Sequence, residues 1–273
     1  MRSKPETKRV LLTVKASPEN SKKYGATLCT AGITDTGEWI RLYPIQYADI
    51  IRTKIPRYSW VEVECYQDSE HDTRKESYKI VPDTLHVVEQ PREVSKGHAD
   101  WGYRNTLILP HLSESLADLV EQSKRDNTSL GLIKPVDLLD FYLDTRDEKE
   151  ADYSYSQKDV QMLLTGESMP LLQKIPHYSY NFTCGGCGGE NSCTSAGHHS
   201  SVCLDWEMTA SFVNWKRDKP EKYEEMLREK YFEDMKRHEL YFFMGTHHIY
   251  KTWMIIGLYY PPKKQDRSLF EFG

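Results

Sequence analysis

The sequence lacks several features that would place it in a familiar class. No apolar run approaches the roughly 20 residues that span a bilayer, and the longest candidate, Trp253–Tyr260, has the length of a strand. The charged start MRSKPETKRV is not followed by an apolar core long enough for a signal peptide. The chain also has no P-loop, nucleophile elbow or His-Glu-x-x-His motif. We therefore expect a cytoplasmic protein without membrane contact, and the sequence favours a binding module over an enzyme.

An excess of positive charge is also lacking. The 273 residues carry a formal net charge of −5, which argues against a protein that coats nucleic acid indiscriminately. The charge is uneven, because residues 1–60 hold 11 Lys and Arg against 5 Asp and Glu, a local +6, so residues 61–273 sum to −11. A basic N-terminal part is compatible with a polyanion on one face, and chance asymmetry of a solvated surface explains it equally well.

Aromatic residues, in contrast, are plentiful at 12%, which indicates a folded chain. The first 90 residues contain at least five short strand-like runs that are separated by turns and not by long helices. In Trp60–Tyr66, for example, Val61, Val63 and Cys65 alternate with glutamates, as in a half-buried strand. This pattern predicts a small barrel or a sandwich.

The rest of the chain mixes predicted helices with strands. Leu112–Asp126 is predicted to be helical because its leucines recur at helical spacing and Ser113 or Ser115 can cap it. Gly131 and Pro135 interrupt Thr128–Asp140, which is therefore interpreted as a connector. The predicted division is a β-barrel over 1–110, a helical connector over 111–136 and a C-terminal domain over 137–273. That domain would contain a short helix at 157–164, a metal-binding loop at 184–203 and two helices at 205–237.

Four of the six cysteines lie within twenty residues, in a segment that also contains His198 and His199. In a chain without a secretory signal, such clustering indicates a metal site and not disulfides. A Cys-x-x-Cys pair brings two sulfurs to one ion from a tight turn, and the surrounding glycines permit the bends that this requires. The preferred zinc ligands are Cys184, Cys187, Cys193 and His198, with His199 and Cys203 as alternatives.

Other interpretations of this segment remain open. A glycine-rich loop with free thiols is possible, and a redox Cys-x-x-Cys is disfavoured because no βαβ pattern surrounds it. A catalytic zinc would need three ligands, an open position and a base, for which Asp205 or Glu207 is available. Asp205-Trp206-Glu207 is more simply explained as a helix start, with acids near the positive end of the helix dipole. The isolated Cys29 and Cys65 are expected in the core.

Basic and aromatic residues alternate in the predicted strands around residues 39–60. Aromatic faces stack on bases and cationic groups pair with phosphates, so this region is a candidate nucleic-acid interface. Alternatively, the tryptophans lie in the core and the charges only solvate the surface. The candidate contacts are Trp39, Arg41, Tyr43, Arg52, Lys54 and Arg57.

Several segments resemble a family of prokaryotic dual-OB-fold domain proteins. The similarity lies in Leu11–Gln46, in SLGLIKP at 129–135, in the Cys and Gly-His block before Asp205, and in FMGT at 243–246 with Trp253. It implies two OB-like barrels with a zinc loop in the second, and an association with mobile-element defence, where OB folds bind nucleic acids or nucleotides. Cys187 and the longer spacing between Cys193 and Gly197 depart from the family's pattern, so the fourth ligand stays open.

These observations predict an α+β fold, mainly β, with two small OB-like barrels and helical insertions. The expected function is a nucleic-acid-binding accessory protein with structural zinc. The resemblance implies a subunit of an anti-phage or mobile-element system, with a second protein as partner. The alternatives are a zinc-dependent nuclease or hydrolase, and a scaffold or sensor that binds a protein or a nucleotide.

Overall fold

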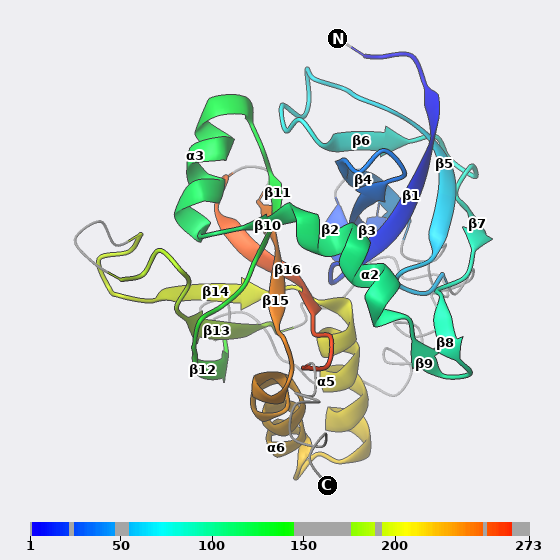
Figure 1. The fold of residues 1–273 in the computed structure, drawn as a ribbon. Helices are drawn as coiled ribbons and strands as arrows, with labels where there is room; N and C mark the ends of the chain where they lie inside the picture. The colour runs from blue at the N-terminus through cyan, green and yellow to red at the C-terminus, as the bar shows by residue number, and fades with distance from the viewer. Residues whose placement is uncertain are drawn as a thin grey trace, which may run out of the picture.

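The computed structural model describes residues 2–21, 25–46, 55–144, 176–188, 193–247 and 250–263. These residues form a mixed α+β fold, mainly of strands, with two seven-stranded sheets and few helices (Figure 1). A small hairpin is made by β8 (Glu93–Ser95) and β9 (His98–Ala99). The predicted short helix at 157–164 lies outside the described residues.

The first sheet closes on itself as a five-stranded barrel. Its strands follow the order β1-β3-β4-β6-β5, and β5 pairs back onto β1, so no edge remains within this ring. Strands β2 and β7 are added outside the ring. The strands are β1 (Glu6–Lys15), β2 (Glu19–Ser21), β3 (Gly25–Thr34), β4 (Trp39–Gln46), β5 (Trp60–Tyr66), β6 (Ser77–Ile80) and β7 (His86–Glu89).

Alternation of apolar and polar residues explains how these strands build a core. In β5 the side chains of Val61, Val63 and Cys65 are fully buried, while Glu62 and Glu64 between them are half-buried. Successive side chains of a strand point to opposite faces, so the three apolar residues line the barrel interior. The barrel predicted from this pattern is confirmed.

The second sheet is open in the described residues. Its order is β10-β11-β15-β16-β14-β13-β12, and no ladder joins the two end strands among the residues that the structure describes. The strands are β10 (Leu112–Ser113), β11 (Leu130–Ile133), β12 (Leu138–Leu143), β13 (Tyr178–Phe182), β14 (His199–Cys203), β15 (Tyr241–Thr246) and β16 (Trp253–Tyr259).

Four α-helices accompany the sheets in the described residues: α2 (Trp101–Ile108), α3 (Leu116–Asp126), α5 (Trp206–Asp218) and α6 (Tyr223–Arg228). Ser115 caps α3, where its hydroxyl accepts from the Asp118 amide and the Asp118 carboxylate accepts from the Ser115 amide. The predicted helix is therefore present, with a start four residues later. None of these helices is long and apolar enough to cross a membrane.

The segment interpreted as a connector contributes to the second sheet. Residues 111–136 contain β10, α3 and β11, and β11 lies between β10 and β15. Gly131, taken as a chain break, is instead a site of close approach, since a Cβ there would lie 2.4 Å from Cδ2 of Leu119 on α3. The glycine lets α3 pack directly on the sheet.

The two halves share one interior. A single cluster of buried residues contains Leu12 and Val63 from the barrel together with Phe182 and Phe242 from the second sheet. Backbone pairing continues across the junction, where the Ser17 amide donates to the Leu204 carbonyl at 2.6 Å. The barrel and the second sheet therefore pack as one body.

Candidate metal centre and nucleic-acid interface

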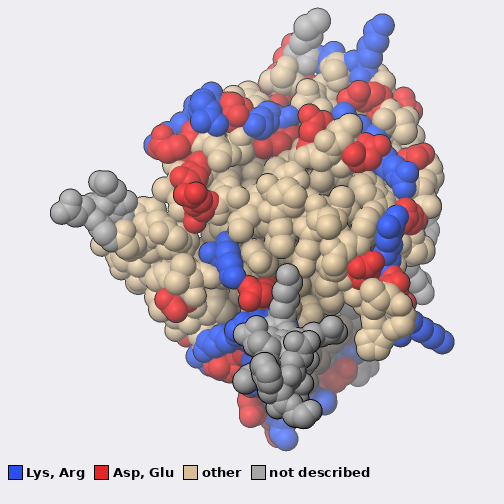
Figure 2. Space-filling model, viewed as in Figure 1, with Lys and Arg blue, Asp and Glu red and all other residues tan. Residues whose placement is uncertain are grey.

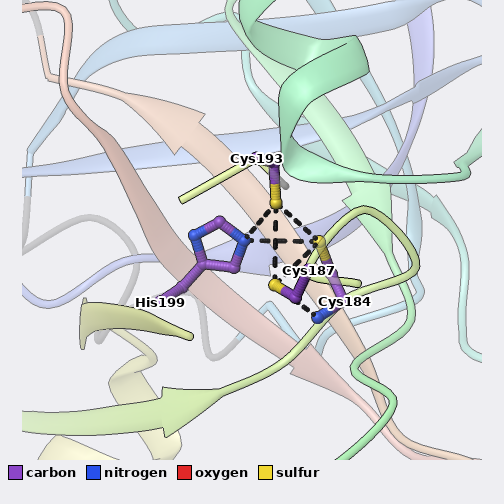
Figure 3. A group of neighbouring side chains, drawn as sticks. All are labelled: Cys184, Cys187, Cys193 and His199. Atoms are coloured by element: carbon purple, nitrogen blue, oxygen red, sulfur yellow. Dashed lines mark hydrogen bonds between the residues drawn. The ribbon is translucent and has the colours of Figure 1, made fainter. Parts of the chain in front are cut away.

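Three cysteines and one histidine converge in the loop between β13 and β14 (Figure 3). The Sγ atoms of Cys184 and Cys193 are 3.6 Å apart, those of Cys187 and Cys193 also 3.6 Å, and those of Cys184 and Cys187 3.8 Å. Nε2 of His199 lies 3.3 Å from Sγ of Cys184 and 3.1 Å from Sγ of Cys193. All four candidate ligand atoms point at a common centre.

The distances between the sulfur atoms fit a tetrahedral zinc shell. Bonds of about 2.3 Å from zinc to sulfur place two sulfurs of a tetrahedron about 3.8 Å apart. The observed separations of 3.6–3.8 Å match that edge, and they are far longer than the roughly 2.05 Å bond of a disulfide. A set of three cysteines and one histidine is a common structural zinc site. The described residues thus fit a metal ion at this position.

The loop backbone holds the sulfurs in place. The Cys187 amide donates to the Cys184 carbonyl at 3.0 Å, and the Cys193 amide donates to the Gly186 carbonyl at 2.8 Å. The Cys184 amide donates to Sγ of Cys187 at 3.2 Å. These bonds close the turn that brings the two sulfurs of the Cys-x-x-Cys pair together.

Glycine is required in this turn because it lies against the start of α3. A Cβ at Gly185 would lie 2.7 Å from the Glu114 carbonyl oxygen. A Cβ at Gly186 would lie 2.9 Å from Cβ of Ser115, the residue that caps α3. The turn at Gly185 and Gly186 and the α3 N-terminus therefore pack too closely for larger residues, so this turn sets the β13–β14 hairpin directly against α3.

The histidine of the cluster is His199, and this corrects the preferred set from the sequence, which contained His198. His199 begins β14, and its register opposite Phe182 directs the imidazole to the sulfurs, with the two ring centroids 5.2 Å apart. His198 precedes the strand, where its Nδ1 lies 3.1 Å from the Ala196 carbonyl oxygen. In adjacent extended residues the side chains point to opposite sides, which sequence spacing alone could not resolve.

Cys203 is a core residue. It ends β14, four residues or about 13 Å along the strand from His199, and only 1% of its surface is exposed. Burial and the carboxylate of Asp205 raise the pKa of its thiol well above the usual range. Cys184, Cys187 and Cys193 form the cluster without it.

Burial also shapes the protonation of the cluster. It raises the pKa of Cys193 to about 12, with further contributions from the neighbouring thiols of Cys184 and Cys187. Burial, with a contribution from His198, lowers the pKa of His199, which favours the neutral imidazole that binds metal ions. A divalent cation at the centre of the cluster would favour the thiolate form of a cysteine ligand.

Two arginines proposed as nucleic-acid contacts are instead buried. Arg41 is 2% exposed and donates to the Ser129 carbonyl at 2.9 Å and to Sγ of Cys29 at 3.1 Å. Arg57 has a side chain that is 7% exposed and an ion pair with Asp205 at 3.2 Å. Neither guanidinium is available to a phosphate in solvent, and this corrects the sequence-based assignment. A strand pattern does not distinguish a solvent-facing arginine from one covered by another domain.

The other candidates have different positions. Trp39 is half-buried at the start of β4, with its ring centroid 4.9 Å from that of His111, and Tyr43 is half-buried farther along the strand. Arg52 and Lys54 lie outside the described residues. Among the proposed contacts that the structure describes, Trp39 lines a groove on the surface, and Arg57 lines a separate cavity.

That groove has a volume of about 550 Å³ and runs between the barrel and the second sheet. Trp39, Tyr78 and His111 bring three aromatic rings to it, and Lys8 and Lys75 bring two ammonium groups. Sequence analysis missed all of these except Trp39, because they come from separate segments that only the fold brings together.

Two protein-family models match this chain, one over each half. The family model of the domain of unknown function DUF8758 matches residues 6–110, which contain the barrel. That of the domain of unknown function DUF8757 matches residues 112–272, which contain the second sheet and the cysteine cluster. No curated protein gives a significant match. Because the second match covers more than half of the 273 residues, this chain belongs to the DUF8757 family.

Proposed function

We propose that this protein binds single-stranded nucleic acid and that zinc in the cluster of Cys184, Cys187, Cys193 and His199 has a structural role. The convergence of four protein side chains carries the zinc assignment. Four protein ligands complete a tetrahedron and leave no open position for a water or a substrate. A closed shell supports a binding module in preference to a zinc hydrolase.

The groove between the halves supports the nucleic-acid part of the proposal. Its rings of Trp39 and Tyr78 offer faces for base stacking, and Nζ of Lys8 lies 5.0 Å from the centroid of Tyr78, next to the same faces. Aromatic platforms flanked by cations are typical of sites that bind unpaired bases. Lys75 is paired with Asp126 at 2.8 Å, but such an exposed pair is weak and can exchange for a phosphate.

The surface charge favours a local site of this kind. On the face in Figure 2, basic and acidic side chains are interspersed around the rim, and uncharged side chains fill the middle. A broad basic surface that would follow a duplex is not seen on this face. A short groove that takes a few unpaired nucleotides is consistent with this distribution.

The hydrolase alternative receives less support. Glu207, the base considered for it, has Oε2 3.4 Å from a guanidinium nitrogen of Arg57. It lines a cavity that contains none of the four cluster residues.

The resemblance to dual-OB proteins supports the further proposals of a second OB-like barrel and of a role as a subunit of a mobile-element defence system, with another protein as partner.

Fluorescence anisotropy with labelled single-stranded DNA and RNA of about a dozen nucleotides tests the proposal. Trp39→Ala is expected to weaken binding by about 1–3 kcal/mol, the usual contribution of one stacked base. Lys8→Gln is expected to flatten the salt dependence, because one phosphate contact fewer lowers the slope by about 0.7. Trp215→Ala on α5 is the matched control, and it should bind as the wild type does.

Two results would count against the proposal. One is wild-type affinity in both the Trp39 and the Lys8 variants. The other is shortening of the oligonucleotide by the zinc-loaded protein on a denaturing gel, which would place the hydrolase first.

A further inference from the structure

A second cavity of about 430 Å³ lies at the junction of the two halves. Lys15 and Arg57 enter it from the barrel, Arg104 from α2, and Trp206 from the start of α5. Because residues 6–110 and 112–272 both contribute to its wall, neither matched region alone would form it. The groove described above has a separate set of lining residues.

Arg104 is the unusual residue of this cavity. It is 9% exposed, its guanidinium carbon lies 4.1 Å from the ring centroid of Tyr58 and 5.0 Å from that of Trp101, and its Nε is buried without a hydrogen-bond partner. No described carboxylate forms an ion pair with it. A buried cation without a counter-ion is costly, so its retention indicates a ligand that supplies the missing negative charge.

Arg57, in the same wall, shows what a satisfied buried arginine looks like. It donates to the Asp205 carboxylate at 3.2 Å, to the Leu258 carbonyl at 2.6 Å and to the Thr13 carbonyl at 3.1 Å. These bonds join the halves and leave Arg57 little capacity for a ligand. Arg104 has no comparable set of bonds, so the two arginines have different roles.

Lys15 adds a second available cation. Its Nζ donates to the Ile55 carbonyl, and burial lowers its pKa to about 8, with Arg57 adding to that shift and Glu207 opposing it. The wall therefore holds three cations, Lys15, Arg57 and Arg104, and the carboxylate of Glu207, while Asp205 beside the wall pairs with Arg57. Because Arg57 pairs with both carboxylates, Lys15 and Arg104 are the cations that remain to meet an anion.

The remaining wall is aromatic, from Tyr58, Trp101, Trp206 and Tyr260. Flat aromatic side chains stack on planar rings, and a volume of about 430 Å³ lies within the range of about 300–1,000 Å³ that is usual for small-molecule sites. We propose that this cavity binds a 5′-mononucleotide, with its phosphate at Arg104 and Lys15 and its base against the aromatic wall. This site goes beyond the proposed strand-binding groove and does not depend on it.

Isothermal titration calorimetry of the full chain with 5′-AMP, adenosine and inorganic phosphate tests the site. We expect one 5′-AMP per chain, and at least tenfold weaker binding of adenosine and of inorganic phosphate, since each carries only half of the recognised chemistry. Arg104→Gln and Lys15→Gln should each weaken 5′-AMP binding at least tenfold.

Arg92→Gln is the matched control, because Arg92 also stacks on a ring, that of Tyr103 at 3.9 Å, but lies outside the cavity with half of its side chain exposed. It should bind 5′-AMP as the wild type does, and so should Trp39→Ala, which separates this site from the groove. Thermal unfolding of each variant establishes that it is folded. Absence of saturable 5′-AMP binding at millimolar concentration, equal affinity for inorganic phosphate, or wild-type affinity in both cavity variants would overturn the proposal.

Discussion

The barrel and the second sheet hold their chains together by different means. The barrel closes through backbone pairing of β5 with β1. In this ladder Glu6 lies opposite Cys65 at one end, and Leu11 lies opposite Trp60 at the other. The second sheet is open in the described residues, and a cluster of three cysteines and a histidine lies within its β13–β14 hairpin, whose glycine turn packs against the start of α3. Backbone closure needs no particular side chain, whereas the proposed metal site of the hairpin depends on four.

The cysteines of the two regions show the same contrast. Cys65 in the barrel is fully buried among apolar side chains, and burial raises its pKa to about 11. Cys184 is almost as buried, at 3% exposed, but it lies within 3.8 Å of two other sulfurs and a histidine nitrogen. Burial is similar at the two positions, and only the neighbours distinguish a core thiol from a metal ligand.

The largest expected effect comes from removing one ligand. Cys184→Ser should lower the zinc content below one per chain and lower the free energy of unfolding by more than about 4 kcal/mol, because loss of a structural metal is among the few changes that exceed this range. Cys65→Ser, the matched control, should cost only the roughly 1–3 kcal/mol of a buried hydroxyl without partners. Metal analysis and urea unfolding measure both quantities.

Equal losses of stability in the two serine variants, with no zinc in the wild type, would contradict the metal assignment. A chelator should have the same effect as Cys184→Ser on the wild type and no effect on that variant. This comparison separates the loss of metal from the loss of a buried sulfur.

A smaller effect is expected at the junction between the regions. Arg57→Met removes the partner of Asp205, whose side chain is 3% exposed, and leaving a buried carboxylate unpaired costs about 3–5 kcal/mol. Because the ion pair joins the halves, calorimetry should also show their unfolding begin to separate into two transitions. Arg237→Met, at a side chain that is 62% exposed, should change stability by less than about 0.5 kcal/mol. A single transition at the wild-type temperature would show that the ion pair does not couple the halves.

The smallest effect is a pH dependence at Lys15. Its pKa is lowered from 10.5 to about 8 in the folded chain, mainly by burial, so the unfolded state binds more protons between these values and stability rises as the pH rises. Lys15→Met lacks this rise. The difference in the free energy of unfolding between this variant and the wild type should therefore shift in favour of the wild type by roughly 2 kcal/mol between pH 7 and pH 10. Parallel stability curves for the two proteins would mean that Lys15 titrates normally in the folded state.

Local patterns predicted a good part of the fold. The alternation in Trp60–Tyr66 predicted β5, and the spacing of leucines after Ser115 predicted α3. Both elements depend on neighbours within a few residues, which the sequence displays directly. The prediction failed at Leu130–Ile133, where a glycine taken as a break serves the close approach of a helix that lies elsewhere in the chain.

Three of the four residues of the cysteine–histidine cluster were predicted as metal ligands. Cys184, Cys187 and Cys193 were identified from spacing, which brings thiols together through a short loop. The choice between His198 and His199 depended on where β14 begins, because that register decides which imidazole faces the sulfurs. The spacing in the sequence limits which side chains can reach one centre, and the strand register decides which of the two histidines does so.

The sequence by itself determined the strand-rich character of the chain and the presence of a cysteine cluster, since both follow from residues that are near one another. Only the tertiary structure decided the roles of Arg41 and Arg57, which bind Ser129 and Asp205 across the junction. The cavity around Arg104 likewise draws its wall from segments more than 150 residues apart, such as Lys15 and Trp206. The burial and charge environment of such residues depends on contacts between distant segments, and no local pattern encodes which segments will meet.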